Sequence, residues 1–319
     1  MPCKRSSQLS YPPFRSAKDN IFHHLCHLMS PIPINTFNYK GIDVSMLRLD
    51  EAHNNLQGNK FYKLKYNLEA AQLSGYSSLL TFAGAFSNHL HAVATAGKLL
   101  GFNTIGIIRG EDDIHNPTLQ YVRENGMQLK FISREQYRQF RDEQHLLDAL
   151  TQEFGKYYFL PEGGTNQLAV KGCAEILADI HQDYTHIFCS VGTGGTLAGL
   201  ISTPRITGKI IGIAALKSVE AIKKNIAELI DPNATTSWEI CDEYHFGGFA
   251  KYHPELIQFI NHFQSQYHIQ LDPIYTCKMM FAIFDKIEKG KISSSHKILC
   301  IHTGGLQGWS GWHHRFPQK

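Results

Sequence analysis

The sequence predicts an α/β protein built from two domains. The chain has 319 residues, and from about residue 77 onward short apolar runs alternate with longer amphipathic segments. Several of the apolar runs end in glycine-bearing loops, at 83–88, 162–166, 191–196 and 302–308. Strands separated by helices imply parallel sheets with right-handed crossovers, and the length exceeds that of one small domain. Ligands bind at the carboxyl ends of such strands, so these loops indicate one shared site.

Each short apolar run is expected to be a strand, and the amphipathic segments between them are expected to be helices. The expected strands are SSLLTFAG (77–84), TIGIIRG (104–110), LKFIS (129–133), YYFLP (157–161), HIFCSV (186–191), KIIGIAAL (209–216) and KILCIHTGG (297–305). Apolar residues recur at helical spacing over 88–100, 166–180 and 217–230, which predicts helices there.

Composition and charge argue against several classes of protein. Hydrophobic residues make up 43% of the chain and charged residues 18%, which is typical of a chain that folds throughout. The net charge is only +3 and the basic residues are scattered, so we expect no nucleic-acid partner. Seven widely spaced cysteines without a CxxC pair indicate reduced thiols in a cytoplasmic protein.

Neither a membrane nor a metal ion is expected as a partner. The basic N-terminal segment has no apolar run behind it, and no later apolar stretch approaches the ~18 residues of a membrane span. The neighbouring histidines, such as His89 and His91, lack the i, i+4 spacing of helical metal ligands.

The loop at residues 192–196, GTGGT, suits a phosphate group. It follows the expected strand HIFCSV and precedes an apolar helical segment that begins near Leu197. Glycines let consecutive backbone amides turn toward one point, and a helix N-terminus favours an anion. The sequence has neither a Walker GK[ST] tail nor GxGxxG, which argues against a nucleotide. A plain tight turn is the structural alternative.

The segment GNKFYKLK at 58–65 places three lysines at an expected transition from loop to helix. A lysine that attacks an aldehyde must be deprotonated, and burial beside apolar groups lowers its pKa. Lys60, directly after Gly58 and Asn59, suits that role, whereas Lys63 and Lys65 are expected on a solvated helix face. A solvated lysine at a helix start is the alternative for Lys60.

Four motifs taken in order resemble the fold-type II pyridoxal-phosphate enzymes, in the branch of 1-aminocyclopropane-1-carboxylate deaminase and D-cysteine desulfhydrase. The motifs are GNKFYKLKY (58–66), FAGAFSNHLHAVA (82–94), SVGTGGTLAG (190–199) and IHTGG (301–305). The resemblance implies a tryptophan synthase β subunit-like fold of two three-layer α/β/α domains with pyridoxal 5'-phosphate between them. It divides the chain into a small domain, 65–165, and a large domain made of 1–64 and 166–319.

The same resemblance assigns roles to individual residues. The lysine that holds the cofactor as a Schiff base falls on Lys60. Ser87 and Asn88 match the loop that binds the substrate carboxylate, with Asn88 also at the cofactor's ring hydroxyl and His89 beside them in the substrate pocket. Ser87 also fits a helix N-cap, and the two roles are compatible. The expected contacts of the cofactor phosphate are Thr193, Gly194, Gly195 and Thr196.

Two departures distinguish this chain from the cyclopropane deaminases. Thr276, in DPIYTCK at 272–278, stands where those enzymes have a glutamate, and Thr303 matches the threonine that faces the ring nitrogen in the desulfhydrases. A hydroxyl partner favours a neutral pyridine ring. Tyr275 matches one tyrosine implicated in ring opening, but Phe249 stands roughly where the second would be and has no hydroxyl. The structural alternatives are an apolar pocket wall for Phe249 and a residue covering the core for Tyr275.

The resemblance therefore implies α,β-elimination on a small amino acid, with D-cysteine as the best candidate and pyruvate, ammonia and sulfide as products. Lys60 would remove the Cα proton, Ser87 would position the carboxylate, and Tyr275 would act on the departing group. One alternative is a 1-aminocyclopropane-1-carboxylate deaminase that gives 2-oxobutyrate and ammonia. Others are a non-catalytic protein that binds pyridoxal phosphate or an amino acid, and a nucleotide-binding α/β protein. The family usually forms homodimers, so we expect a second copy as partner.

Overall fold

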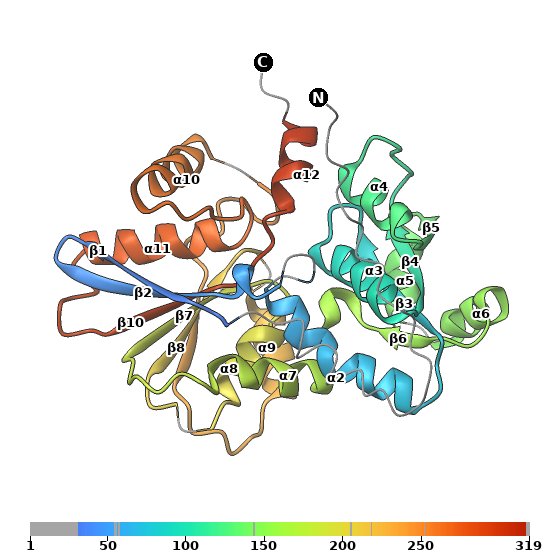
Figure 1. Cartoon of the computed structure of the whole chain (residues 1–319), viewed down its shortest axis with the longest axis horizontal. Coiled ribbons are helices and arrows are strands. Elements are labelled where there is room, and N and C mark those ends of the chain that lie inside the picture. Colours follow the sequence, from blue (N-terminus) through green and yellow to red (C-terminus); the bar gives the residue numbers. More distant parts are fainter. Residues whose placement is uncertain are drawn as a thin grey trace, which may run out of the picture.

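The computed structural model describes residues 31–53, 56, 58–142, 144–204, 206–217, 219–251 and 253–316. Two β-sheets occupy separate halves of the molecule, and helices cover both of them (Figure 1). Within the described residues, no helix combines the length and the apolar character needed to cross a membrane.

The larger sheet has the strand order β1-β2-β10-β7-β8-β9. Its strands are β1 (Ile34–Tyr39), β2 (Ile42–Arg48), β7 (His186–Val191), β8 (Lys209–Ala214), β9 (Trp238–Cys241) and β10 (Ile298–His302). The edge strand β1 runs antiparallel to β2, and every other pair is parallel. The carboxyl ends of the parallel strands therefore meet along one edge, where the loops after β7 and β10 lie.

Alternate side chains of the larger sheet enter two different cores. Phe188 and Cys300 pack on one face, while Cys189 and Ile301, their neighbours in sequence, pack on the other. Successive residues of a strand point to opposite faces, so helices must cover both. The first face is covered by α10 (Pro254–Tyr267) and α11 (Thr276–Glu288), and the second by α7 (Gln167–Cys173), α8 (Gly195–Ile201) and α9 (Val219–Leu229).

The smaller sheet is entirely parallel, with the order β5-β4-β3-β6. Its strands are β3 (Ser78–Gly84), β4 (Asn103–Arg109), β5 (Gln128–Ile132) and β6 (Tyr158–Leu160). Leu80 and Phe82 pack toward α5 (Arg134–Asp142) and α6 (Gln144–Phe154), whereas Leu79 and Ala83 face α3 (Asn88–Leu100) and α4 (Pro117–Glu124). Both sheets thus form the middle layer of an α/β/α sandwich, as predicted.

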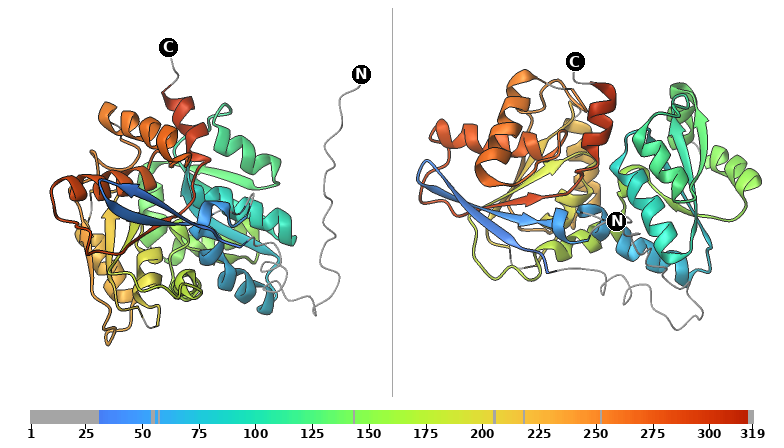
Figure 2. Two further views of the ribbon diagram at one scale, coloured as in Figure 1. Left: turned by 60° about the vertical axis from the view of Figure 1, so that its left-hand side comes forward. Right: turned by 45° about the horizontal axis from the view of Figure 1, so that its top comes forward.

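Two helices connect the halves. α2 (Asn59–Leu73) contacts α7 and α8 of one half and α3 of the other, and Figure 2 shows it between them. The C-terminal helix α12 (Gly308–Arg315) returns from the larger half to contact α4. The division into domains at residues 65 and 165 stays a prediction, and its first boundary falls within α2.

All seven expected strands are present, as β3 to β8 and β10, and α3 has the predicted bounds. The segment 166–180 forms α7 followed by the short 3-10 helix η3 (Ala174–Leu177), and α9 lies inside the predicted 217–230. The strands β1, β2 and β9 are not predicted by the sequence pattern. β1 is a largely exposed edge strand and β9 has four residues, so neither carries a strong apolar run.

Candidate active site

A cavity of about 960 Å³ lies where the carboxyl ends of the strands in both sheets meet. Loops after β3, β4, β7 and β10 line it, together with the first turn of α2. It contains every predicted site residue except Gly195: Lys60, Ser87, Asn88, His89, Thr193, Gly194, Thr196, Phe249, Tyr275 and Thr303. Gly195 instead lies against Thr165, where a Cβ would come within 2.8 Å of the Thr165 hydroxyl.

Lys60 occupies the first turn of α2, and its position depends on the glycine before the helix. Gly58 has φ of 69°, and a Cβ there would lie 2.0 Å from the backbone oxygen of Thr303. The Lys60 Nζ donates to Asn59 Oδ1 at 3.0 Å, and Asn59 Nδ2 donates to Thr196 Oγ1 at 2.8 Å. These contacts direct the Lys60 amine into the cavity, beside the 192–196 loop.

The surroundings of the Lys60 amine lower its pKa. Desolvation above all, together with the nearby Lys63 cation, lowers its pKa from 10.5 to about 7. An amine with this pKa is partly neutral near pH 7, and only the neutral amine attacks an aldehyde. The alternative of an ordinary solvated lysine does not fit this environment.

The prediction that Lys63 and Lys65 lie on a solvated helix face is wrong. Lys63 is only 3% exposed and Lys65 6% exposed, because α2 is packed between α7, α8 and α3 rather than lying on the surface. Lys65 pairs with Glu175 of η3. Lys63 turns toward the cavity, which it lines one helical turn after Lys60.

The surroundings of Lys63 fit a bound phosphate. Its Nζ donates to Gly163 O at 2.9 Å, to Thr165 Oγ1 at 3.0 Å and to Thr193 Oγ1 at 3.3 Å. The part of the chain that the structure describes gives it no carboxylate partner. A buried cation without a counter-ion is costly, and an anion at the adjacent glycine loop would neutralise it.

Ser87 is both a helix cap and a cavity residue. Its Oγ accepts hydrogen bonds from the backbone N–H groups of His89 at 3.2 Å and Leu90 at 3.3 Å, which caps α3. The hydroxyl proton is still free to bond to an anion in the cavity. Asn88 also lines the cavity, and its amide lies against Gly305 of the loop after β10. The cap thus orders the loop that carries both side chains.

His89 presents a buried acceptor to the site. The Thr81 hydroxyl donates to Leu160 O at 2.9 Å, so His89 Nε2, 3.0 Å from Thr81 Oγ1, must carry the proton and donate. Burial, with the Lys60 and Lys63 cations, holds the pKa of His89 well below 6.5. The ring is therefore neutral, and its Nδ1 accepts no hydrogen bond from the described protein. This nitrogen can receive a donor from a ligand.

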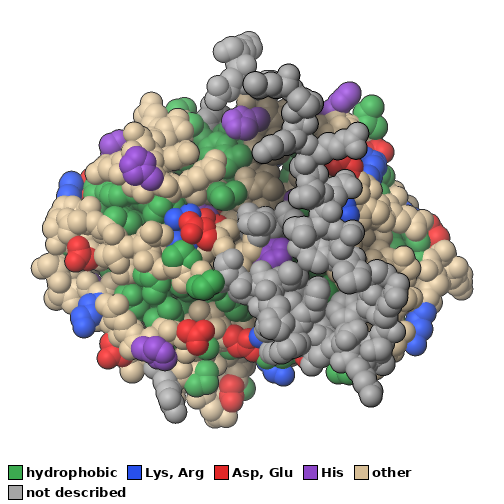
Figure 3. Space-filling model, viewed as in Figure 1, with side chains coloured by type: hydrophobic (Ala, Val, Ile, Leu, Met, Phe, Trp, Pro, Cys, Tyr) green, Lys and Arg blue, Asp and Glu red, His purple; other side chains and the backbone are tan. Residues whose placement is uncertain are grey.

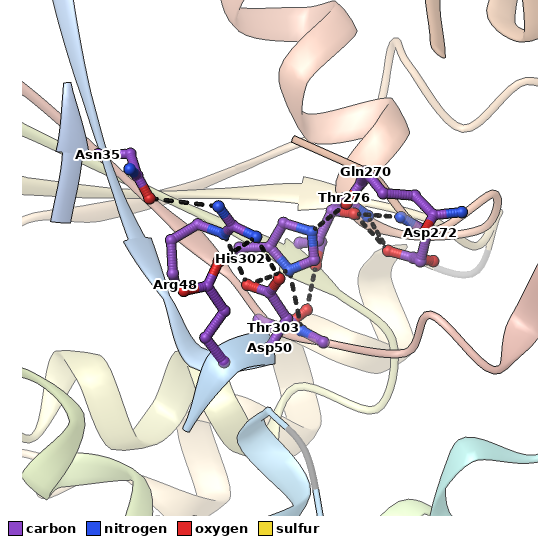
Figure 4. Close-up of polar contacts among 11 residues, drawn as sticks. Asn35, Arg48, Asp50, Gln270, Asp272, Thr276, His302 and Thr303 are labelled. Atoms are coloured by element: carbon purple, nitrogen blue, oxygen red, sulfur yellow. Dashed lines mark hydrogen bonds and ion pairs between the residues drawn. The ribbon is translucent and has the colours of Figure 1, made fainter. Parts of the chain in front are cut away.

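A pair of hydroxyls lies at the end of the larger sheet. Thr303, 8% exposed, places its Oγ1 3.2 Å from the Oγ of Ser190, and both residues line the cavity. The residue before Thr303 belongs to a buried polar network (Figure 4). His302 Nδ1 lies 3.1 Å from Asp50 Oδ1, and Arg48 donates to both oxygens of that carboxylate at 2.9 and 2.7 Å. This network fixes the backbone that carries Thr303.

Thr276, at the position of the deaminase glutamate, does not reach the cavity. It is completely buried, and its hydroxyl and backbone N–H both donate to Asp272 Oδ2 (Figure 4). Asp272 Oδ1 accepts from the N–H groups of Ile274 and Tyr275 at 2.9 and 2.7 Å. These contacts stabilise the start of α11 and so position Tyr275.

Phe249 and Tyr275 form one wall of the cavity, with their ring centroids 6.2 Å apart. Burial raises the pKa of the Tyr275 phenol, and the Asp272 and Glu162 charges raise it further, so the group stays protonated. Lys278 connects the backbone segments that form this wall. Its fully buried amine donates to the carbonyls of Ala215, His245 and Gly248 at 3.2, 2.9 and 2.9 Å.

Sequence reasoning missed several lining residues, among them Asn59, Lys63, Ser190, Arg109, Arg134, Arg138 and Arg315. Lys63 follows Lys60 by three residues, so helical spacing could have predicted that both face the same site. Arg109 lies at the carboxyl end of an expected strand, where ligands bind, so it could have been predicted as well. Nothing in the local sequence indicates Arg315. Among the described side chains, no group of three or more His, Cys, Asp or Glu residues is placed to hold a metal ion.

Comparison with known proteins gives consistent results. The family model of pyridoxal-phosphate dependent enzymes matches residues 32–304. A Pyrococcus horikoshii protein named as a putative 1-aminocyclopropane-1-carboxylate deaminase is 29% identical, covering 84% of this chain and 86% of its own. The bifunctional D-cysteine desulfhydrase/1-aminocyclopropane-1-carboxylate deaminase of Arabidopsis thaliana, a mitochondrial protein, is 28% identical over 89% of this chain and 78% of its own.

A solved structure described as an ACC deaminase homologue superposes with a TM-score of 0.77 at 26% identity, covering 93% of this chain and 98% of that one. The match of the family model spans both sheets and every predicted site residue. The chain therefore belongs to the pyridoxal-phosphate-dependent enzymes of fold type II, in the branch of 1-aminocyclopropane-1-carboxylate deaminases and D-cysteine desulfhydrases, and its cofactor is pyridoxal 5'-phosphate.

Proposed function

We propose that the protein catalyses α,β-elimination on a small amino acid, with D-cysteine as the best candidate, giving pyruvate, ammonia and sulfide. The observation that carries this choice is Phe249. It lies beside Tyr275 in the cavity wall, where ring opening would call for a second hydroxyl. Phenylalanine cannot transfer a proton, so the wall suits elimination better than cyclopropane opening.

The hydroxyl pair of Ser190 and Thr303 supports the same proposal. We assign Thr303 to the ring nitrogen of the cofactor, with Ser190 Oγ 3.2 Å from its hydroxyl. A hydroxyl does not hold a protonated pyridine as a carboxylate would. The deaminase glutamate is replaced by Thr276, whose hydroxyl is used by Asp272.

We assign the cofactor's contacts to the residues that the cavity brings together. Lys60 would hold its aldehyde carbon, Asn88 its ring hydroxyl, and Lys63 with the loop 192–196 its phosphate. Bound in this way, pyridoxal phosphate supplies an electron sink for the pair left when a bond to the substrate α-carbon breaks.

The protein's own groups would bind the substrate and transfer the protons. The Ser87 hydroxyl, in the loop at the start of α3, binds the substrate carboxylate, which orients the α-carbon toward Lys60. The Lys60 amine, with its pKa near 7, takes the Cα proton. Tyr275, held protonated, donates to the departing sulfur rather than accepting from it.

The test is to incubate the purified holoenzyme with D-cysteine, L-cysteine and 1-aminocyclopropane-1-carboxylate and to measure each 2-oxo acid and sulfide. We expect pyruvate and sulfide in equal amounts from D-cysteine. Formation of 2-oxobutyrate from the cyclopropane alone would replace our choice with the deaminase activity, which is the activity named for the Pyrococcus horikoshii relative. No turnover of any amino acid would support the non-catalytic alternative.

The variant Phe249→Tyr supplies the hydroxyl that the wall lacks. We expect any activity on the cyclopropane to rise by at least about tenfold relative to activity on D-cysteine. One positioned general acid or base typically accelerates a reaction by about 10²-fold or more. The control is Phe249→Leu, which changes the wall without adding a hydroxyl. Equal responses of the two variants would show that Phe249 does not select the reaction.

We further propose a homodimer in a reducing compartment such as the cytoplasm. The dimer follows from the family resemblance. The compartment is supported by the described cysteines, which are all free thiols: Cys173, Cys189, Cys241, Cys277 and Cys300. Light scattering of the purified protein and fractionation of cells that produce it would test the two proposals separately.

A further inference from the structure

The described arginine side chains fall into two groups. Arg48 pairs with Asp50 and Glu51, and Arg123 pairs with Asp112. The remaining described arginines have no carboxylate partner within the part of the chain that the structure covers, and all of them line the cavity: Arg109, Arg134, Arg138 and Arg315. The unpaired guanidinium groups are thus concentrated at one place.

These arginines come from both halves of the molecule. Arg109 ends β4; its guanidinium carbon lies 5.4 Å from the ring centroid of Tyr137, and its Nη2 lies against Gly84. Arg134 begins α5, and Arg138 follows it by one helical turn. Arg315, at the end of α12, has its guanidinium carbon 5.9 Å from the ring centroid of Phe86. All four are exposed, which places them at the open mouth of the cavity.

The anions already assigned to the cavity have other partners. Lys63 and the loop 192–196 face the cofactor phosphate, and the Ser87 loop faces the α-carboxylate. Glu162 is the one carboxylate among the described lining residues, so the arginines leave the mouth strongly positive. On the face shown in Figure 3, by contrast, the described acidic and basic side chains are interspersed. This face therefore shows no comparable gathering of described basic side chains.

We propose that these arginines bind a second anionic group on the substrate. Guanidinium forks match carboxylate and phosphate oxygens, and arginines from both halves converge on one space. The preferred substrate is then an amino acid whose β-substituent carries a carboxylate or phosphate. D-Cysteine has the same reacting Cβ–S bond but lacks this second anionic group. This inference rests on the elimination proposed above.

The reaction on such a substrate balances without another reactant than water. The amino acid loses its Cα proton and its β-substituent, which leaves 2-aminoacrylate. Water then hydrolyses the 2-aminoacrylate to pyruvate and ammonia. For S-carboxymethylcysteine the Cβ–S bond breaks, the sulfur keeps the electron pair and takes a proton, and thioglycolate is released.

The test compares S-carboxymethyl-D-cysteine with S-carbamoylmethyl-D-cysteine, a neutral amide of nearly the same shape. We expect the carboxylate to have at least ~10-fold higher kcat/KM for pyruvate release, because the guanidinium groups make charge-assisted hydrogen bonds to the carboxylate and not to the amide. The preference should fall as salt rises, since the mouth is exposed. The L-enantiomers of the same two compounds test chirality.

Variants show whether the arginines cause the preference. In the double variant Arg134→Gln/Arg138→Gln, and in Arg109→Gln, the ratio of the two kcat/KM values should fall toward one. Each ratio compares two substrates in the same variant at full cofactor occupancy. A loss of activity that affects both substrates equally therefore cancels from the ratio. Arg123→Gln removes a paired arginine outside the cavity and should leave the ratio unchanged.

The outcomes separate this inference from the proposed function. Turnover of D-cysteine without any preference for the anionic analogues would overturn the arginine site and leave the elimination intact. A preference that survives in the arginine variants would overturn it as well. If D-cysteine and all the analogues give no pyruvate, the proposed elimination itself fails.

Discussion

Lys60 and Lys63 lie one helical turn apart on α2, and neither is paired with a carboxylate among the described residues, yet their surroundings suit different tasks. Among the described residues, Lys60 hydrogen-bonds only to Asn59, and its pKa is near 7, which suits covalent chemistry. Lys63 is surrounded by oxygen acceptors, which suits a charge that stays in place. Lys63 also supports the role proposed for Lys60, because the Lys63 cation lowers the pKa of Lys60.

The low pKa of Lys60 predicts how cofactor uptake depends on pH. Only the neutral amine reacts with the aldehyde, so the rate at which the apoprotein captures pyridoxal phosphate should rise with pH to half its maximum near 7. Stopped-flow absorbance across about pH 5 to about pH 9 measures this, with Nα-acetyl-lysine, pKa ~10.4, as the unperturbed control. Lys63→Met removes a like charge and should move the midpoint upward. A rate that keeps climbing through pH 9 would contradict the assignment.

The buried position of Lys63 predicts a loss of cofactor affinity in Lys63→Met. Losing a charge-assisted hydrogen bond worth about 1.5–3 kcal/mol weakens binding by roughly 10- to 100-fold. Equilibrium titration of the apoprotein with pyridoxal phosphate gives the dissociation constant. Lys65→Met is the matched control, since Lys65 is equally buried on the same helix but contacts Glu175 outside the cavity. It should lower the melting temperature and leave the dissociation constant unchanged.

At the scale of elements, the start of α2 and the loop after β10 depend on each other. The backbone N–H of Asn59 donates to Thr303 O at 3.2 Å, and the Gly58 N–H donates to Leu49 O at 2.9 Å. The lysine at the helix start and the threonine of the loop therefore share one backbone junction. A change at this junction should affect the cofactor and the fold together.

Gly58→Ala tests this junction. The new Cβ would lie 2.0 Å from Thr303 O at a position with φ of 69°, so the backbone must move. We expect a loss of more than about 3 kcal/mol in unfolding free energy and weaker cofactor binding, measured by denaturation and titration. The matched control is Gly75→Ala, which has the same φ of 69° but no atom within 4 Å of the new Cβ. It should cost only about 1 kcal/mol and leave cofactor binding intact.

At the scale of the whole molecule, the site exists only because the two halves are held face to face. The cavity takes Lys63, Thr303 and Tyr275 from elements around the larger sheet, and Ser87 and Arg109 from the smaller one. α12 reinforces this arrangement, since His314 of that helix bonds to Asp113 beside α4 at 2.8 Å. A cofactor bound in the cavity contacts both halves at once.

Cofactor removal should therefore destabilise the whole protein. A ligand that binds only the folded state adds about 2.7 kcal/mol when present at ~100 times its dissociation constant. Thermal unfolding of the apoprotein at increasing pyridoxal phosphate should show a steadily rising melting temperature. Pyridoxal, which lacks the phosphate that Lys63 and the 192–196 loop would contact, should stabilise much less at equal concentration. Equal effects of the two compounds would contradict the phosphate assignment.

Local pattern determined a large part of this protein. The seven predicted strands are short apolar runs of consecutive residues, and Ser87 and Lys60 belong to motifs whose order indicates the family. The edge strand β1 could not be predicted, because an exposed strand has no apolar run to mark it. The solvation of Lys63 and Lys65 was misjudged for a related reason, since it depends on which other helices pack around α2.

By itself, then, the sequence determined the layered α/β fold and the cofactor, because these depend on periodicity and on motifs of a few adjacent residues, and the same motifs predict Lys60 as the lysine that holds the cofactor. Only the tertiary structure decided which charges are buried and which side chains share the cavity. Arg109, Arg138 and Arg315 are far apart in the chain and meet at one mouth. Burial and proximity depend on packing between distant segments, and no local pattern records them.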